Sequence, residues 1–224
     1  MFNTTLHSPR VTSVLERLQR TADAVDAEVI PRAFAETAKH GAVKDDQAVQ
    51  HALREAYMAI DPPTARFLYN LVRARGGATI VEFGCSFGFS TIHLAAAVKD
   101  LGAGRVVSTE MEPTKVVAAR TNLEAAGVAD VVEILEGDAL LTLAGLEEPI
   151  DVLFLDGWKA LYLPVLKLVE PRLSPDAVVV ADDLDVMPEK LAPYLEYVRN
   201  PQHGYTSVEI PLGDKLEFSV RGRG

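Results

Sequence analysis

The stretch Thr79-Ile-Val-Glu-Phe-Gly-Cys-Ser-Phe-Gly-Phe-Ser90 decides the fold of this chain. Its first five residues are mostly β-branched or aromatic, which predicts a buried strand. Two glycines follow, Gly84 and Gly88, and an apolar run with helical spacing covers residues 91–98. A strand, tight turn and helix in this order bring main-chain N–H groups close to a ligand, because glycine has no Cβ to obstruct the approach. The stretch therefore predicts an α/β domain with a ligand site at its first turn.

The rest of the chain alternates between strand and helix patterns. Strands are predicted at residues 79–83, 105–109, 131–135, 150–155 and 177–181. Helices are predicted between them, at residues 90–99, 113–126, just after 138, and 161–172. Continuous apolar strands are typical of a parallel sheet that helices cover on both faces. A last helix at 188–198 and a hairpin of 206–210 with 216–221 complete a doubly wound, mostly parallel sheet of seven strands with an antiparallel ending.

Residues 1–60 are predicted to form a helical segment that precedes the α/β domain at residues 61–224. Apolar residues recur at helical spacing over 10–30, and Pro31 is expected to interrupt or kink that helix. A second helix is predicted over 45–59 with Asp45 as its cap, and a third over 64–75. The apolar stripe of the first helix is broad enough to pack on the domain, cover a substrate pocket or bury itself against a second subunit.

Composition excludes several classes of function. The chain has 224 residues, 48% of them hydrophobic and 24% charged, and a formal net charge of −10. This acidity argues against nucleic acid or an anionic membrane surface as the main partner. The apolar runs are too short to span a bilayer, and the N-terminus lacks the pattern of a signal peptide. Cys85 is the single cysteine, so no intrachain disulfide can form, and a cytoplasmic protein is expected.

Acidic side chains follow nearly every predicted strand. They are Glu82, Glu110, Asp138, Asp156, and the pair Asp182 and Asp183. Ligands of open parallel sheets bind outside the carboxyl ends of the strands, so these acids are expected to line one crevice. Any one of them alone could instead cap a helix or fix a turn, because Asp favours both positions. Acids at five strand ends together favour a binding site.

The first acids indicate which ligand the crevice binds. A dinucleotide fingerprint is Gly-x-Gly-x-x-Gly, but Ser86 stands where its second glycine would lie. Glu82 would also place negative charge near the phosphates. A cationic nucleoside without phosphate suits the turn better, and S-adenosylmethionine is such a ligand. Glu110 is placed to accept from both ribose hydroxyls, and Asp138 from the adenine amino group.

The remaining acids form an all-oxygen set. Asp156, Asp182 and Asp183 on adjacent strand ends suit a hard divalent cation. The histidines and Cys85 show no zinc spacing. Lys159, three residues after Asp156, is a candidate general base, or else a solvated lysine at the start of a helix.

Two other classes of function stay open at this point. One is an NAD(P)-dependent oxidoreductase on the same kind of sheet, which Ser86 and Glu82 disfavour. The other is a protein that binds S-adenosylmethionine without turnover, as a regulator or structural partner. The intact Lys159 and the three aspartates argue against that second alternative, since a protein without catalysis has no need of them.

The chain resembles the metal-dependent class I O-methyltransferases, a family that includes the animal catechol and plant caffeoyl-coenzyme A enzymes. The resemblance runs from about Asp61 to Val220. Its most specific pieces are Val81-Glu-Phe-Gly-x-x-x-Gly-Phe-Ser90, Glu110, Asp156-x-Trp-Lys-x-x-Tyr-Leu-Pro164, Ala181-Asp-Asp183 and Asp214-Lys-Leu-Glu217. The pairing of Trp158-Lys159 with Tyr162-Leu-Pro places the chain closer to the catechol branch. Residues 1–60 match poorly, and in this family that region covers the substrate.

The resemblance implies a Rossmann-like class I methyltransferase fold with S-adenosylmethionine along the strand ends. The implied donor contacts along the methionine and ribose are Ile60, Gly84, Ser86, Gly88 and Ser90, beside Glu82. Glu110 would hold the ribose, and the implied contacts of the adenine are Met111, Asp138, Ala139 and Trp158. A homodimer is expected, because members of this family often pair.

The resemblance also assigns the chemistry. Asp156, Asp182 and Asp183 would bind Mg²⁺, Lys159 would be the general base, and Glu217 would orient the second substrate hydroxyl. The family usually has asparagine where this chain has Asp183, so the preferred metal can differ. The implied acceptor is a small vicinal dihydroxy aromatic, selected by the loops at residues 33–46 and 187–204.

Overall fold

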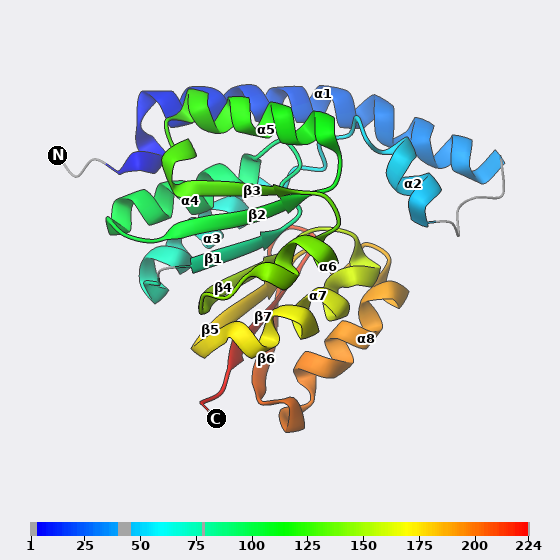
Figure 1. Cartoon of the computed structure of the whole chain (residues 1–224). Coiled ribbons are helices and arrows are strands. Elements are labelled where there is room, and N and C mark those ends of the chain that lie inside the picture. The colour runs from blue at the N-terminus through cyan, green and yellow to red at the C-terminus, as the bar shows by residue number, and fades with distance from the viewer. Residues whose placement is uncertain (1–3, 40–45, 78, 224) are drawn as a thin grey trace.

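One seven-stranded sheet runs through the molecule, in the order β3-β2-β1-β4-β5-β7-β6 (Figure 1). The computed structural model describes residues 4–39, 46–77 and 79–223 of the chain. Five strands are parallel, and β7 is antiparallel to both β5 and β6. The strands are β1 (Thr79–Phe83), β2 (Arg105–Glu110), β3 (Val132–Glu136), β4 (Ile150–Leu155), β5 (Leu173–Ala181), β6 (Tyr205–Ile210) and β7 (Leu216–Arg221). The predicted fold class is confirmed.

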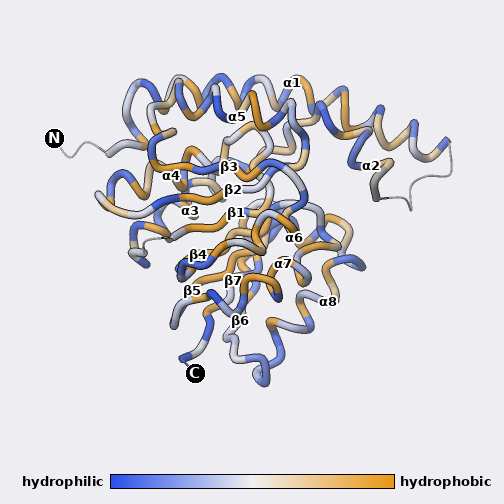
Figure 2. Tube along the Cα trace, in the orientation of Figure 1, coloured by the Kyte–Doolittle hydropathy of each residue, from blue (hydrophilic) through white to orange (hydrophobic). Residues whose placement is uncertain are grey.

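Helices cover both faces of this sheet. They are α1 (Pro9–Lys39), α2 (Asp46–Ala52), α3 (Pro62–Arg75), α4 (Phe89–Leu101), α5 (Pro113–Ala126), α6 (Ala139–Thr142), α7 (Tyr162–Val169) and α8 (Pro188–Arg199). On one face, α3, α4 and α5 pack on strand residues such as Ile80 and Val106. On the other face, α6, α7 and α8 pack on their neighbours Val81 and Val107. Figure 2 shows hydrophobic residues concentrated on the central strands, as expected for a sheet buried on both faces.

Strand β1 lies where the order of the sheet reverses. It pairs with β2 on one side and with β4 on the other. The connections that leave β1 and β4 therefore run to opposite faces of the sheet, and a crevice is expected between them at the carboxyl ends. The glycine turn after β1 lies at this point.

Helix α1 forms an outer layer along α5, as Figure 1 shows. Its first half buries Val11, Val14 and Leu18 in the core cluster that α4 and α5 share. The N-terminal segment thus packs on the domain, which was one of its three expected roles. Its second half extends past the sheet and packs with α2.

Pro31 does not interrupt the first helix, which was one of the two effects expected of it. Helix α1 continues through Pro31 to Lys39, over 31 residues. A proline inside a helix removes one hydrogen bond and crowds the preceding turn, at a cost of about 3 kcal/mol. Val29 and Ala33, on either side of it, are both buried against α2. Burial of these apolar residues offsets the cost of the proline. The sequence pattern around a proline does not show that such burial occurs.

The second helix is shorter than predicted. It spans Asp46–Ala52 instead of 45–59, and Asp45, its predicted cap, lies outside the described residues. The helix does not continue to residue 59, because the amides of Tyr57 and Met58 bond to the Asp26 carboxylate on α1 instead of to a preceding turn.

Within the described residues, no helix is both long enough and apolar enough to cross a membrane.

Burial places one titratable group of α4 in its neutral form. His93 is 4% exposed, and its Nδ1 lies 2.9 Å from the Phe89 carbonyl oxygen, so this nitrogen is the donor. Desolvation lowers the pKa of His93 from 6.5 to about 4, and the Arg66 guanidinium acts in the same direction.

His93 should make the free energy of unfolding depend on pH. The folded state favours the neutral ring, so its stabilising contribution is complete above pH 6.5 and is lost as the pH falls toward 4, by about 3 kcal/mol. Urea unfolding between pH 4 and 7 tests this against His93→Asn, which keeps a donor without a titrating ring. As the pH falls, the free energy of unfolding should decrease more steeply for the wild type than for His93→Asn. An equal decrease in the two proteins would contradict the assignment.

Candidate active site

The glycine turn after β1 is pressed against the end of β4. Gly84 has a φ of +106°, and a Cβ there would lie 2.6 Å from the Asp156 carbonyl oxygen. The Asp156 amide donates to the Phe83 carbonyl oxygen at 2.9 Å, which joins the two strand ends. Gly88 is left-handed, with a φ of +88°, and starts α4. Both glycines are required by conformation, and Gly84 also by the close approach of a neighbouring chain.

Glu110 at the end of β2 holds this turn. Its Oε2 accepts from the Ser86 amide at 2.8 Å, and its Oε1 accepts from the Glu112 amide at 2.9 Å. Ser86 has a φ of +46°, which a residue other than glycine adopts only when its surroundings hold it. Met111, the next residue, is 56% exposed. Glu110 and Met111 thus lie together at the predicted nucleoside side of the crevice.

Glu82 lies beneath the turn. It is fully buried, and the hydroxyls of Thr91 and Ser108 donate to its Oε2. Its Oε1 is buried with no hydrogen-bond partner within the described part of the protein. Burial raises the pKa of this carboxyl. A buried acid with an unused oxygen beside the glycine turn fits a cationic ligand and disfavours a diphosphate.

The other predicted donor contacts occupy two settings. Ile60, Ser90 and Ala139 are all buried, at 7%, 5% and 5% exposure. Asp138 caps α6, because its Oδ1 accepts from the Leu140 amide at 2.9 Å. Its capping role, the alternative open from the sequence, is therefore present. One carboxylate has room for both roles, since its second oxygen can accept from a ligand.

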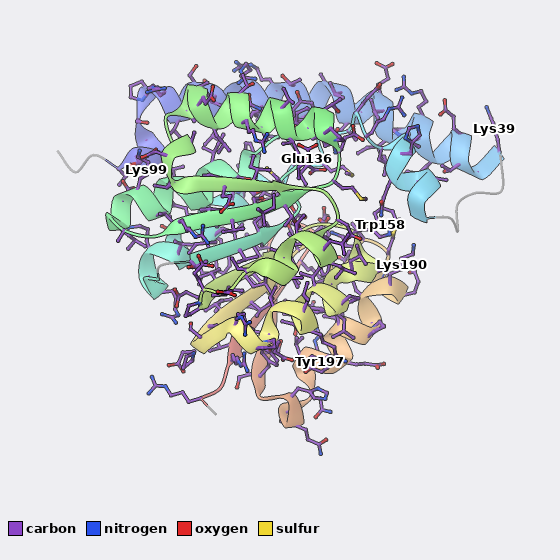
Figure 3. All side chains as sticks on the ribbon, in the orientation of Figure 1. Lys39, Lys99, Glu136, Trp158, Lys190 and Tyr197 are labelled. Carbon is purple, nitrogen blue, oxygen red and sulfur yellow. The ribbon has the colours of Figure 1, made fainter. Side chains whose placement is uncertain are left out.

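Trp158 joins the site to the N-terminal helices. It packs against the buried cluster of α1 and α2, whose members are Val29, Ala33, Val49, Leu53 and Ala56. The Lys190 ammonium lies 5.1 Å from the Trp158 ring centroid, and Figure 3 shows these two side chains side by side. The Trp158 Nε1 is buried without a partner among the described residues. The indole therefore lies between the segment 1–60 and the strand-end crevice.

Lys159 lies among the three predicted metal ligands. Its Nζ lies 2.8 Å from Asp183 Oδ2 and 3.9 Å from Asp156 Oδ1. It also donates to the Tyr162 hydroxyl at 2.7 Å. Lys159 is only 6% exposed, so the alternative of a solvated lysine is wrong. The structure brings Lys159, Asp156 and Asp183 into one group, with Asp182 adjoining. Lys159 and Asp182 are buried, and the Asp183 side chain is 31% exposed.

The carboxylates of this group repel one another. Burial raises the pKa of Asp156 well above its usual range, with Asp182 as the next cause. Burial, and then Asp183, raises the pKa of Asp182 to about 7. Carboxylates that are hard to ionise together would gain from a shared cation, so the donor set fits a hard divalent metal.

The side chains are not arranged as a finished metal site. No group of three or more His, Cys, Asp or Glu residues in the described ranges is positioned to hold a metal. Two contacts account for the present arrangement: Asp183 faces Lys159, and Asp182 Oδ1 accepts from the Asp183 amide at 2.8 Å. The metal-ligand assignment therefore stays a prediction.

Glu217 lies beside Ala181 at the end of β5, but its carboxylate is already paired. It is fully buried on β7, where both of its oxygens pair with Arg199 of α8 and Ser207 donates at 2.6 Å. This environment gives the acid a structural partner at each oxygen. Its predicted role toward a substrate hydroxyl receives no support from these contacts.

Two residues that organise the site had no role predicted from the sequence, although Tyr162 belongs to a quoted motif. Tyr162 contacts the Lys159 ammonium, and Asp26 of α1 binds the turn that precedes Ile60. A signal for Asp26 was present, because it stands four residues after Ala22 and three before Val29, both buried. An acid on the buried face of a helix requires a partner.

Comparisons with known proteins agree with this geometry. Residues 81–184 match the family described as Methyltransferase domain. Catechol O-methyltransferase of Mycobacterium tuberculosis is 35% identical over 149 residues, which cover 63% of this chain and 67% of that protein. Catechol O-methyltransferase B of Danio rerio is 28% identical over 197 residues, covering 82% of this chain and 73% of that protein.

Solved structures share the fold. The cofactor-bound protein Rv0187 from MTB superposes with a TM-score of 0.70 at 28% identity, over 86% of this chain and 96% of that one. A putative O-methyltransferase from Klebsiella pneumoniae gives a TM-score of 0.71 at 21% identity, over 96% and 91%. The fold and site define a class I methyltransferase. The chain belongs to the S-adenosylmethionine-dependent O-methyltransferases, which removes the nicotinamide alternative.

Gly84→Ala should lower the free energy of unfolding by about 2 kcal/mol or more, since a Cβ meets the end of β4 and the left-handed φ becomes strained. Gly145→Ala is the matched control, because nothing lies within 4 Å of a Cβ there. Urea unfolding of both variants measures the difference. Equal stability of the two variants would mean that the turn does not need glycine at residue 84.

Proposed function

We propose that the protein transfers a methyl group from S-adenosylmethionine to one hydroxyl of a small vicinal dihydroxy aromatic, with Mg²⁺ or another hard divalent cation bound. The observation that carries the proposal is the partly buried group of Asp156, Asp182, Asp183 and Lys159 beside the glycine turn. The two curated relatives are catechol O-methyltransferases, which supports this acceptor class.

The donor would lie along the turn after β1. Glu110 would accept from the ribose hydroxyls with the lone pairs that the Ser86 and Glu112 amides leave free. Glu82, buried beneath the turn, would lie near the cationic methionine end without contacting it. Met111, more than half exposed, would cover the adenine. These contacts bind and orient the donor and contribute no bond-making chemistry.

The acceptor would lie at the aspartate group. A divalent cation held by Asp156, Asp182 and Asp183 would supply positive charge that favours the ionised hydroxyl. Lys159, held by Tyr162 and close to Asp183, would take the hydroxyl proton. The resulting oxygen attacks the methyl carbon in line with the departing sulfur, so one C–O bond forms as one C–S bond breaks. Alignment of two reactants in a site with little water supplies most of the rate.

Lys159→Met should lower kcat by about 100-fold or more, because the proton acceptor is removed. Affinity for S-adenosylmethionine should stay within about threefold of wild type, since Lys159 contacts the acceptor side. Lys167→Met is the control, an exposed lysine on the following helix. A turnover near the wild-type value at neutral pH would remove Lys159 from the role of base.

Chelation of divalent ions should abolish methyl transfer to catechol, and Mg²⁺ should restore it. Asp182→Asn should raise the Mg²⁺ concentration needed for half-maximal rate by about tenfold or more, because one charged ligand is lost. Asp185→Asn, on the exposed pair with Lys215, should leave that concentration unchanged. Rates that do not respond to the chelator would exclude a metal from the reaction.

A further inference from the structure

The contact between α1 and the turn before α3 is not used by the proposed chemistry. The Asp26 carboxylate accepts from two consecutive amides, with Tyr57 N at 2.6 Å from Oδ1 and Met58 N at 2.8 Å from Oδ2. Met58 has a φ of +45°, a left-handed value that costs free energy in a residue with a side chain. Asp26 therefore holds a strained turn in place by hydrogen bonds to an ionisable acid, which are stronger than neutral ones.

The same turn is bonded to the glycine turn after β1. Ser86 Oγ donates to the Tyr57 carbonyl oxygen at 2.7 Å. The Tyr57 ring stacks on Phe87, with centroids 3.8 Å apart and planes inclined by 9°. The Ser86 amide in turn donates to Glu110 at 2.8 Å. A continuous path of hydrogen bonds thus joins Asp26 to the acid proposed to hold the ribose.

A second path joins α1 to the same turn. Arg17 Nη2 donates to Asn122 Oδ1 at 2.8 Å, and Asn122 Nδ2 donates to the Phe87 carbonyl oxygen at 2.9 Å. The Lys115 ammonium lies 5.6 Å from the Phe87 ring centroid. Helix α1 thus restrains Ser86 through Tyr57 and Phe87 through α5, although it lies outside the matched residues 81–184.

We propose that Asp26 is a positioning residue for the methyl donor. The inference rests on the proposed function, because it assigns the donor to the glycine turn. Asp26 fixes Tyr57 and Met58, and through Tyr57 it fixes Ser86 beside Glu110. The turn is then already ordered when the donor arrives, so less conformational entropy is lost on binding. Donor affinity should depend on Asp26, whereas proton removal at Lys159 should not.

Calorimetric titration with S-adenosylmethionine tests the proposal. Asp26→Asn should raise the donor Kd about tenfold, because one charge-assisted acceptor is lost, and Asp26→Ala should raise it further. Asp23→Asn is the matched control on the same helix, where the exposed Asp23 accepts from Gln19 at 2.8 Å; its Kd should equal that of wild type. In assays with catechol, Asp26→Asn should keep kcat at saturating donor within about twofold and leave the KM for catechol unchanged.

The outcomes separate the two proposals. A wild-type protein that does not bind S-adenosylmethionine would overturn the proposed function. A wild-type protein that binds it, with Asp26→Asn binding equally well, would overturn the positioning role alone. The positioning role would also be overturned if Asp26→Asn lowered kcat at saturating donor as much as it lowered kcat/KM for the donor.

A double-mutant cycle keeps the test decisive where Asp26→Ala does not fold. Asp26→Asn and Ser86→Ala act on the same turn, so the double variant should raise the donor Kd by less than the product of the single effects. A Kd equal to that product would mean that the two residues act independently, which contradicts the hydrogen-bond path through Tyr57.

Discussion

The concentration of buried carboxylates at the carboxyl edge of the sheet is the constraint on which the rest of the site depends. Glu82 is fully buried. Burial and neighbouring carboxylates raise the pKa values of Asp156 and Asp182. Within the aspartate group, Lys159 contributes one positive charge against three acids. Such a group is costly for a fold to maintain unless a cation or a cationic ligand occupies it. The position of these acids at the point where the strand order reverses explains why both substrates would meet there.

The N-terminal helices complete the site from outside the central domain. Helix α1 holds the turn at Tyr57 through Asp26, and its second half belongs to the cluster that packs on Trp158. One helix therefore restrains both the turn before α3 and Trp158. Both contacts need a helix that continues through Pro31. Asp26, which holds the Tyr57 turn, precedes Pro31, and Ala33, in the cluster that packs on Trp158, follows it.

The sheet was predictable because its signals are local. The limits predicted for β1, β4 and β7 agree with the structure. Strands β1 and β4 are mostly apolar runs that end at a turn or an acid, and β7 alternates apolar and polar residues before Gly222. The continuation of α1 past Pro31 and the end of α2 at Ala52 were not predictable, because contacts with residues distant in sequence decide them. Acids at strand ends were predictable as a group from the geometry of parallel sheets. The pairing of Glu217 with Arg199 was not, because it depends on how α8 packs on the sheet.

The most direct test is a crystal structure of the protein with S-adenosylhomocysteine, Mg²⁺ and a catechol. The account predicts the ribose hydroxyls on Glu110 and the metal on Asp156, Asp182 and Asp183, with Lys159 facing a catechol oxygen. A nucleoside bound elsewhere, or a metal absent from the three aspartates at saturating Mg²⁺, would contradict it.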